Sequence, residues 1–170
     1  MYSFAQIYTH IMENLLQLIL QGGVFDTTKM GQILNMTEKE VDEALEKLKD
    51  EKILLGWIPV LHPDYESGLV SAAIELKICP ERDGGFDRLA QRISRFEQVD
   101  SCFLMSGAYD LLLFVKAKNI KEIASFVYER LATIHGVTST ATHFFLRTYK
   151  TMGFIIGQDP NNPDKPVVSA

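Results

Sequence analysis

The chain has 170 residues, an apolar fraction of 46% and a formal net charge of −5, values typical of a globular protein with one medium domain or two small ones. Its apolar runs are far shorter than the roughly 20 residues that cross a bilayer, and its N-terminus lacks the pattern of a secretory signal, so we expect a cytoplasmic protein without a membrane span. The acidic balance disfavours a nonspecific nucleic-acid coat protein but still allows a locally basic surface.

Three helices are predicted in the first 50 residues. The third has the clearest start, because Thr37 and Glu40 have the spacing of a capping box, in which each side chain accepts from the other residue's backbone N–H. The second begins at Asp26-Thr27-Thr28, any of which can cap a helix, and ends before Asn35. The first stops at Gly22-Gly23 and has one apolar stripe, formed by Phe4, Ile7, Ile11, Leu15, Leu18 and Ile19.

An extended segment follows the third helix. Residues 53–61 are mostly apolar and end at His62-Pro63, where proline disfavours helix. We therefore predict a connecting strand over 53–61 and a hinge over 63–68.

After residue 68 the apolar period changes to that of strands alternating with helices. The order is strand, helix, strand, strand, helix, strand, which is the ferredoxin-like pattern of two helices on one face of an antiparallel sheet. The two central strands are expected to join through a short Gly107-Ala108 turn. The predicted segments are strand 69–78, turn 80–85, helix 86–96, strands 99–106 and 109–117, a helix capped by Asn119 and ended by Gly136, and strand 137–150.

The predicted fold class is therefore α+β, with an N-terminal winged-type helix-turn-helix head joined by a strand to a ferredoxin-like βαββαβ domain. The expected boundaries are 1–62 for the head and its connecting strand, 63–68 for the hinge, 69–156 for the ferredoxin-like domain and 157–170 for a loose tail. The tail is set apart because it lacks apolar periodicity.

This organisation resembles the Lrp/AsnC family of bacterial and archaeal regulators. The most specific segment is 106–150, where Gly107-Ala108-Tyr109-Asp110, the segment 135–142 and Leu146-Arg147-Thr148-Tyr149-Lys150 follow the family's order and spacing. The resemblance implies a C-terminal domain that regulates amino-acid metabolism, dimerises through its sheet, assembles dimers into octamers and binds a small effector, often an amino acid. It implies no cofactor and no membrane partner.

Carried over by position, the resemblance suggests an effector site at a turn and at the start of the last strand. A carboxylate could pair with an ammonium group, while backbone amides and hydroxyls could bind a carboxylate. The same pattern also fits a tight hairpin turn whose aspartate bonds the turn itself, and threonines that favour strands through their β-propensity. The candidates are Ser106, Gly107, Ala108, Tyr109, Asp110, Thr138, Thr140 and Thr142.

In the family, the helix that begins at Thr37 would enter the DNA major groove, and the DNA-binding candidates are Lys29, Thr37, Lys39 and Lys47. This helix departs from the expectation, because acidic residues outnumber its lysines and relatives commonly have arginines at positions 43 and 44 and a glycine at position 52. No arginine occurs before Arg82, so we expect weak binding of double-stranded DNA by one head. An octamer could compensate through avidity; alternatively, the protein binds an effector and assembles without binding DNA.

Catalytic residues do not converge in the sequence. The histidines are scattered and do not have metal-ligand spacing with Cys79 or Cys102, which we expect to be reduced, buried thiols. A non-enzyme is therefore predicted. The enzymatic alternative is a siroheme-decarboxylase-like protein that acts on a tetrapyrrole, in which His143 could donate a proton; a lone strand histidine is more often structural.

Overall fold

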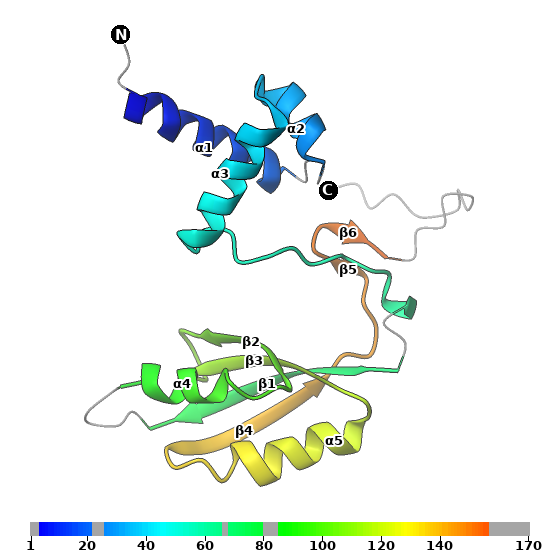
Figure 1. Cartoon of the computed structure of the whole chain (residues 1–170). Helices are drawn as coiled ribbons and strands as arrows, with labels where there is room; N and C mark the ends of the chain where they lie inside the picture. The colour runs from blue at the N-terminus through cyan, green and yellow to red at the C-terminus, as the bar shows by residue number, and fades with distance from the viewer. Residues whose placement is uncertain (1–3, 22–25, 66–67, 80–84, 157–170) are drawn as a thin grey trace, which may run out of the picture. The chain divides into compact units, whose positions relative to one another are not determined.

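The computed structural model describes residues 4–21, 26–65, 68–79 and 85–156. The chain divides into two compact units, Met1–Pro59 and Val60–Ala170, whose elements are labelled in Figure 1. Within the described part of the chain, no helix is both long enough and apolar enough to cross a membrane.

The first unit is a helical head made of α1 (Phe4–Leu20), α2 (Thr27–Leu34) and α3 (Glu38–Asp50). Apolar residues of all three helices meet in one core, and from the predicted stripe of α1 these include Leu15, Leu18 and Ile19. Asp26 caps α2, and Thr37 with Glu40 forms the predicted capping box at α3. The predicted stop at Gly22-Gly23 lies outside the described residues. The buried core consists of Leu15, Met30, Val41, Ala44 and Leu48.

A tight turn between α2 and α3 gives the head its helix-turn-helix geometry. Asn35 ends α2 in the left-handed conformation with φ 56°, which asparagine tolerates better than most residues. The backbone N–H of Met36 donates to the carbonyl of Gly31 at 2.8 Å. A Cβ on Gly31 would lie 2.5 Å from the carbonyl oxygen of Met36, so this turn requires glycine.

The connecting strand predicted over residues 53–61 is wrong, because this segment has no regular secondary structure. A strand needs a second backbone to satisfy its N–H and C=O groups, and apolar, extended-type residues alone do not supply one. A short 3₁₀ helix, Pro63–Tyr65, follows. Several large side chains of the segment are exposed: Ile53, Leu55, Trp57, Ile58, Val60 and Leu61.

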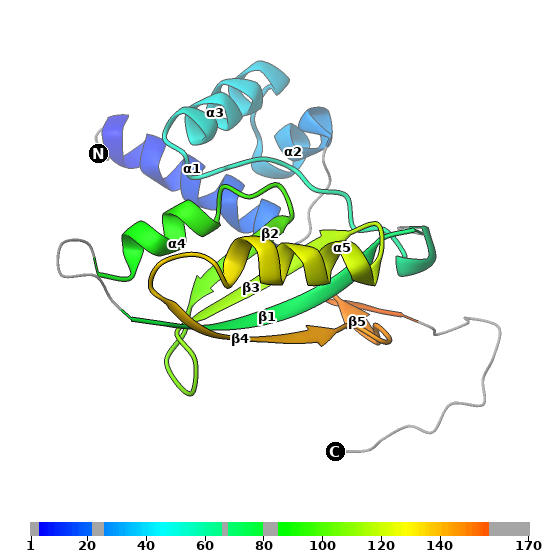
Figure 2. The same ribbon diagram turned by 90° about the horizontal axis from the view of Figure 1, so that it is seen from below.

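The second unit has the predicted ferredoxin-like order. Its sheet has the strand order β2-β3-β1-β4, with every neighbouring pair antiparallel. Figure 2 shows α4 and α5 on the same face of this sheet. The elements are β1 (Val70–Ile78), α4 (Asp87–Ile93), β2 (Val99–Leu104), β3 (Leu111–Ala117), α5 (Ile120–Ser125) with its π-helical continuation η2 (Phe126–Leu131), and β4 (Val137–Phe144).

The two faces of this sheet differ because side chains alternate along each strand. Alternate residues of β1 and β3 are buried under the helices: Ala72, Ile74, Leu76, Ile78, Leu111, Leu113, Val115 and Ala117. On the opposite face three aromatic rings lie in a row, Phe103, Phe114 and Phe145, with both centroid separations 6.0 Å. We term this the open face.

The predicted two-residue turn between β2 and β3 is wrong. Leu104 pairs with Leu111, so residues 105–110 make a six-residue connection. The last strand is also shorter than predicted, since β4 ends at Phe144. The β1–β4 ladder ends with the pair Ala72 and Phe144, although β1 begins at Val70 and the N–H of Phe145 still donates to the carbonyl of Ser71 at 3.0 Å. Residues beyond it form a separate two-stranded sheet, β5 (Lys150–Thr151) and β6 (Phe154–Ile155).

The cysteine prediction was partly wrong. Both thiols are free, but Cys79 is exposed and only Cys102 is half-buried. Cys79 follows the last residue of β1, where the alternation that buries Ile78 turns the next side chain outward. Most of the predicted turn 80–85 and the predicted loose tail lie outside the described residues.

Candidate DNA-binding and effector sites

The β2–β3 connection is anchored to β1 by Asp110. The Asp110 carboxylate Oδ2 accepts from the backbone N–H of Ile78 at 2.7 Å, and the Asp110 N–H donates to the carbonyl of Leu76 at 2.9 Å. The Asp110 carbonyl accepts from the N–H of Met105 at 2.8 Å, which closes the connection. The sequence interpretation had the aspartate bond its own turn; in the structure the backbone of Asp110 closes the connection, while its carboxylate bonds the neighbouring strand.

The crown of the connection is open. Ser106, Gly107 and Ala108 are exposed, and Gly107 has φ +145° with free space where a Cβ would stand. Their backbone amides have no hydrogen-bond partner among the described residues. Tyr109 is half-buried beside them. The crown thus offers several amide donors next to one carboxylate, which suits a small ligand with both a negative and a positive group.

Thr138 lies next to the end of β1 on the side where β4 pairs with it. Its hydroxyl Oγ1 donates to the carbonyl of Lys77 at 3.0 Å, and the N–H of Cys79 donates to the carbonyl of Gly136 at 2.7 Å. Asp110 and Thr138 therefore flank the end of β1 from opposite sides. No side-chain pattern in the sequence marks this role of the β1 end, because backbone groups of Lys77 and Ile78 form it.

Thr140 and Thr142 lie further along β4. They pair with Leu76 and Ile74, so the structure places them progressively further from the β1 end that Asp110 contacts. Both are half-buried on the helix-covered side of the sheet. The eight effector-site candidates thus separate into one group around the β1 end and two threonines along the β4 edge.

The DNA-binding candidates lie on the exposed surface of the head. Lys39 pairs with Glu43 at 3.6 Å and Lys47 pairs with Glu51 at 3.8 Å. On α2, the ammonium of Lys29 lies 3.9 Å from the carboxylate of Asp26. These are exposed pairs, which contribute little to stability and exchange easily with solvent or a phosphate.

Thr37 is occupied by its capping box. Its N–H and its hydroxyl both donate to Glu40 Oε2 at 2.8 Å, and Glu40 N–H donates back to Thr37 Oγ1 at 3.3 Å. The backbone and hydroxyl hydrogen bonds from Thr37 lower the pKa of Glu40 below its usual value of 4.5. A contact from Thr37 to a DNA base would need the same hydroxyl group that forms the capping box.

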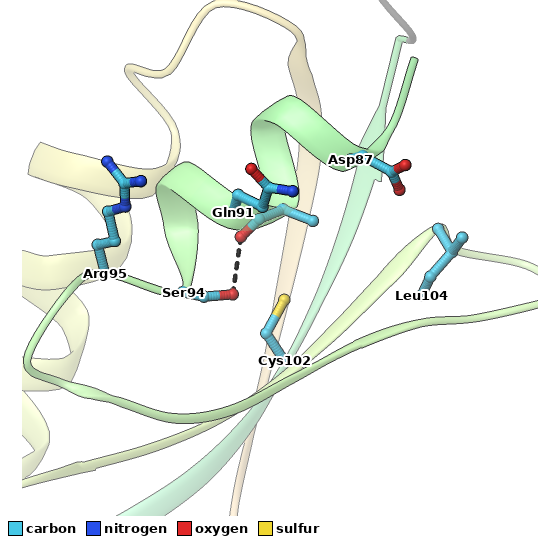
Figure 3. Close-up of a pocket in the computed structure, with 7 residues that line it drawn as sticks. Asp87, Gln91, Ser94, Arg95, Cys102 and Leu104 are labelled. Carbon is cyan, nitrogen blue, oxygen red and sulfur yellow. Dashed lines mark hydrogen bonds between the residues drawn. The ribbon is translucent and has the colours of Figure 1, made fainter. Parts of the chain in front are cut away.

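A hollow of about 360 Å³ lies between α4 and β2. Figure 3 shows Asp87 and Gln91 of α4, Ser94 just after it, and Cys102 and Leu104 of β2 around this hollow. Ser94 Oγ donates to the carbonyl of Ala90 at 2.8 Å. The hollow also has a carboxylate at Asp87, at the start of α4, and a guanidinium at Arg95, just after its end.

His143, the candidate proton donor of the enzymatic alternative, lies on the open face. Its Nε2 is 3.2 Å from Glu75 Oε1. Within the described residues, no group of three or more His, Cys, Asp or Glu side chains could hold a metal ion. The histidine therefore has a structural partner on the neighbouring strand.

The comparisons with known proteins agree with this architecture. Residues 71–153 match the family model described as the Lrp/AsnC ligand binding domain. The HTH-type transcriptional regulator YugG of Bacillus subtilis is 32% identical over 157 residues, which cover 91% of this chain and 93% of that protein.

Two solved structures share the fold. The transcriptional regulator NMB0573 of Neisseria meningitidis, in complex with L-Met, has a TM-score of 0.64 and 22% identity and covers 85% of this chain and 94% of its own. The feast or famine regulatory protein of M. tuberculosis, complexed with L-methionine, has a TM-score of 0.65 and 18% identity, with 86% and 97% covered.

A helix-turn-helix head followed by a ferredoxin-like domain defines a two-domain regulator architecture. With the similarity to YugG extending over nearly the whole of both proteins, the assignment is more specific. The chain belongs to the Lrp/AsnC family and is a transcriptional regulator of this type. The family is one of transcriptional regulators, so the tetrapyrrole-enzyme alternative is not favoured.

Proposed function

We propose that this chain acts in the cytoplasm as a DNA-binding regulator whose ferredoxin-like domain assembles dimers into octamers and senses an amino acid. The principal support for DNA binding is the helix-turn-helix geometry of the head. The tight turn from Gly31 to Met36 and the capped start of α3 leave the outward face of that helix exposed, which is the arrangement that helix-turn-helix proteins use in the major groove.

The charge of α3 sets the expected strength of binding. The helix has six acidic residues and three lysines, and two of those lysines are paired with carboxylates. Since phosphate neutralisation supplies most of the nonspecific affinity, one head should bind weakly. Several heads on one assembled particle would gain affinity through avidity.

The DNA-binding part of the proposal is tested with the upstream region of the protein's own gene. Binding is measured at about 50 and 200 mM salt, with DNA of scrambled sequence as the control. We expect binding at low salt that weakens steeply as salt rises and that favours the upstream region. No binding at low salt would reject the regulator in favour of an assembly protein that does not bind DNA.

Support for dimerisation comes from the open face. Phe103 and Phe145 are each about half exposed, at 49% and 50%, and with Phe114 they form a contiguous aromatic surface. Contiguous apolar surfaces of this kind mark interaction sites in soluble proteins. A second copy of the chain, packed sheet to sheet, would bury these rings on both sides.

For the effector we propose the crown of residues 106–108, with Tyr109, Asp110 and Thr138 as its base and Thr140 and Thr142 at its far edge. The amides of the crown would bind the carboxylate of an amino acid, and the unbonded oxygen of Asp110 would face its ammonium group. Two structural relatives were solved in complex with L-methionine, which makes L-methionine the first probe for this chain.

The effector proposal is tested by thermal shift with each of the twenty amino acids on the full chain. Ser106→Asp places a negative charge in the exposed crown and should reduce or abolish the shift that the wild-type protein shows. Gln98→Glu, an exposed position away from the crown, adds the same charge and should leave the shift intact. An equal shift in both variants would reject the crown as the site.

A further inference from the structure

Three arginines form a row on the outward side of α4. Arg88, Arg92 and Arg95 are spaced i, i+4 and i+7, so a helix brings them to one face. All three are exposed. Arg95 lies in the turn just after α4, where its N–H donates to the carbonyl of Arg92 at 3.4 Å and keeps the helical direction. We term these residues the arginine row.

The opposite side of α4 holds the row in place. Leu89 is 6% exposed and Ile93 is 0% exposed, and both belong to the core of the ferredoxin-like domain. A second hollow, of about 320 Å³, lies on the outward side, lined by Arg88, Leu89, Gln91, Arg92 and Arg95. The row is therefore a surface on a packed element and not a flexible loop.

The row contrasts with the head in its chemistry. The described residues of the head have no arginine, and α3 has twice as many acidic residues as lysines. Arginine presents five N–H donors in a planar fork that matches phosphate oxygens, so a contact made within the protein still leaves donors for a ligand. The arrangement of cations on this chain thus favours phosphate binding on the ferredoxin-like domain.

We propose that the arginine row binds the phosphate backbone of DNA, as a second contact surface that compensates for the acidic recognition helix. The proposal rests on the proposed DNA-binding function. The shape of the row favours a polyanion over a single phosphate group, because its cations extend along a line of about 10 Å at helical rise. One DNA strand presents about three phosphates over that length.

The test compares two triple variants of the full chain that remove the same charge. Arg88→Gln/Arg92→Gln/Arg95→Gln removes the row, and Lys118→Gln/Lys121→Gln/Arg130→Gln removes three exposed cations on, or just before, the other helical segment of the same domain. Binding to the upstream DNA and to a scrambled sequence is measured over about 50 to 200 mM salt. Each lost phosphate contact lowers the slope of log affinity against log salt by about 0.9.

We expect the row variant to lower that slope by about 2 to 3 and to weaken both DNAs equally, because phosphate contacts are independent of sequence. The control should keep most of the wild-type slope. Equal slopes for the two variants, or a row variant that binds like wild type, would overturn the proposal while leaving DNA binding by the wild-type protein established. Absence of wild-type binding would overturn both proposals.

A small phosphate ligand is the competing occupant. Inorganic phosphate is added to wild type and to the row variant in a thermal-shift experiment at matched ionic strength. Stabilisation of the wild type alone, combined with an unchanged DNA slope in the row variant, would assign the row to a small anion and reject the DNA contact.

Discussion

The carboxylate of Asp110 accepts a hydrogen bond from the backbone N–H of Ile78 at 2.7 Å, where continued pairing of β1 with β3 would have placed a backbone carbonyl. The side chain lets the six-residue connection over 105–110 leave the sheet next to Leu111 without leaving the N–H of Ile78 unpaired. Asp110 thus satisfies the backbone N–H at the end of β1 and is also part of the base of the proposed effector site.

Replacing Asp110 should therefore weaken the fold before it affects any ligand. Asp110→Ala removes the acceptor of the Ile78 N–H, and we expect a loss of about 1 to 3 kcal/mol in the free energy of unfolding. Asp110→Asn keeps an oxygen acceptor and should lose less. Urea unfolding of the ferredoxin-like domain checks both, and equal stability of Asp110→Ala and wild type would contradict the structural role.

Gly31 should be the least replaceable glycine of the described head. In Gly31→Ala the new Cβ would lie 2.5 Å from the carbonyl oxygen of Met36, so the turn must shift and we expect a loss of about 1 to 3 kcal/mol. Gly56→Ala is the matched control, because nothing lies within 4 Å of its Cβ position. Thermal unfolding followed by circular dichroism should separate the two; similar melting temperatures would refute the steric argument.

Phe103 tests the proposed dimer face. Phe103→Asp introduces a charge at a ring that is half exposed in the single chain, so the monomer should fold while sheet-to-sheet packing is lost. Tyr128→Asp, at an exposed ring on η2, is the control. Sedimentation velocity should show smaller particles for Phe103→Asp only. If the particle size of that variant equals that of wild type, the open face is not the interface.

Local chemistry explains what the sequence predicted well. The capping box of Thr37 and Glu40 needs only two residues three positions apart, and the structure forms it as expected. The near-continuous apolar run over residues 109–117 predicted a strand, and β3 spans Leu111–Ala117. In both cases the signal lies within a few neighbouring residues, so no distant part of the chain could overrule it.

Long-range pairing explains what the sequence missed. The last residue of β4, Phe144, pairs with Ala72, 72 positions earlier in the chain, and the six-residue connection over 105–110 depends on the hydrogen bond from the Ile78 N–H to the Asp110 carboxylate. Residues 53–61 have strand-like composition without a partner backbone in the described structure. The arginine spacing on α4, by contrast, is local and can be read directly from the sequence.

Replacing Lys52 by glycine, the residue that relatives commonly have at this position, is expected to stabilise the head. It adopts φ 57° just after α3, and the N–H of Ile53 donates to the carbonyl of Leu48 at 2.9 Å, the hydrogen bond of a Schellman motif. Lys52→Gly relieves the left-handed strain and should raise stability by about 1 kcal/mol. Lys49→Gly, within the same helix, should lower it by a similar amount. Equal effects of the two substitutions on the melting temperature would contradict this account.

The capping box of α3 should make the stability of the head depend on pH. The pKa of Glu40 is lowered by its hydrogen bonds from Thr37, so the carboxylate binds protons less readily in the folded state than in the unfolded state. Its contribution is then present above the usual pKa of 4.5 and is lost as pH falls through the lower folded value. Glu40→Gln retains a neutral acceptor, and wild type should therefore exceed it in melting temperature at pH 7 by more than at pH 3. Glu46→Gln, at an exposed position of the same helix, gives the baseline for removing one surface carboxylate. A difference between wild type and Glu40→Gln that stays constant from pH 7 to pH 3 would show that the charge of Glu40 does not stabilise the box.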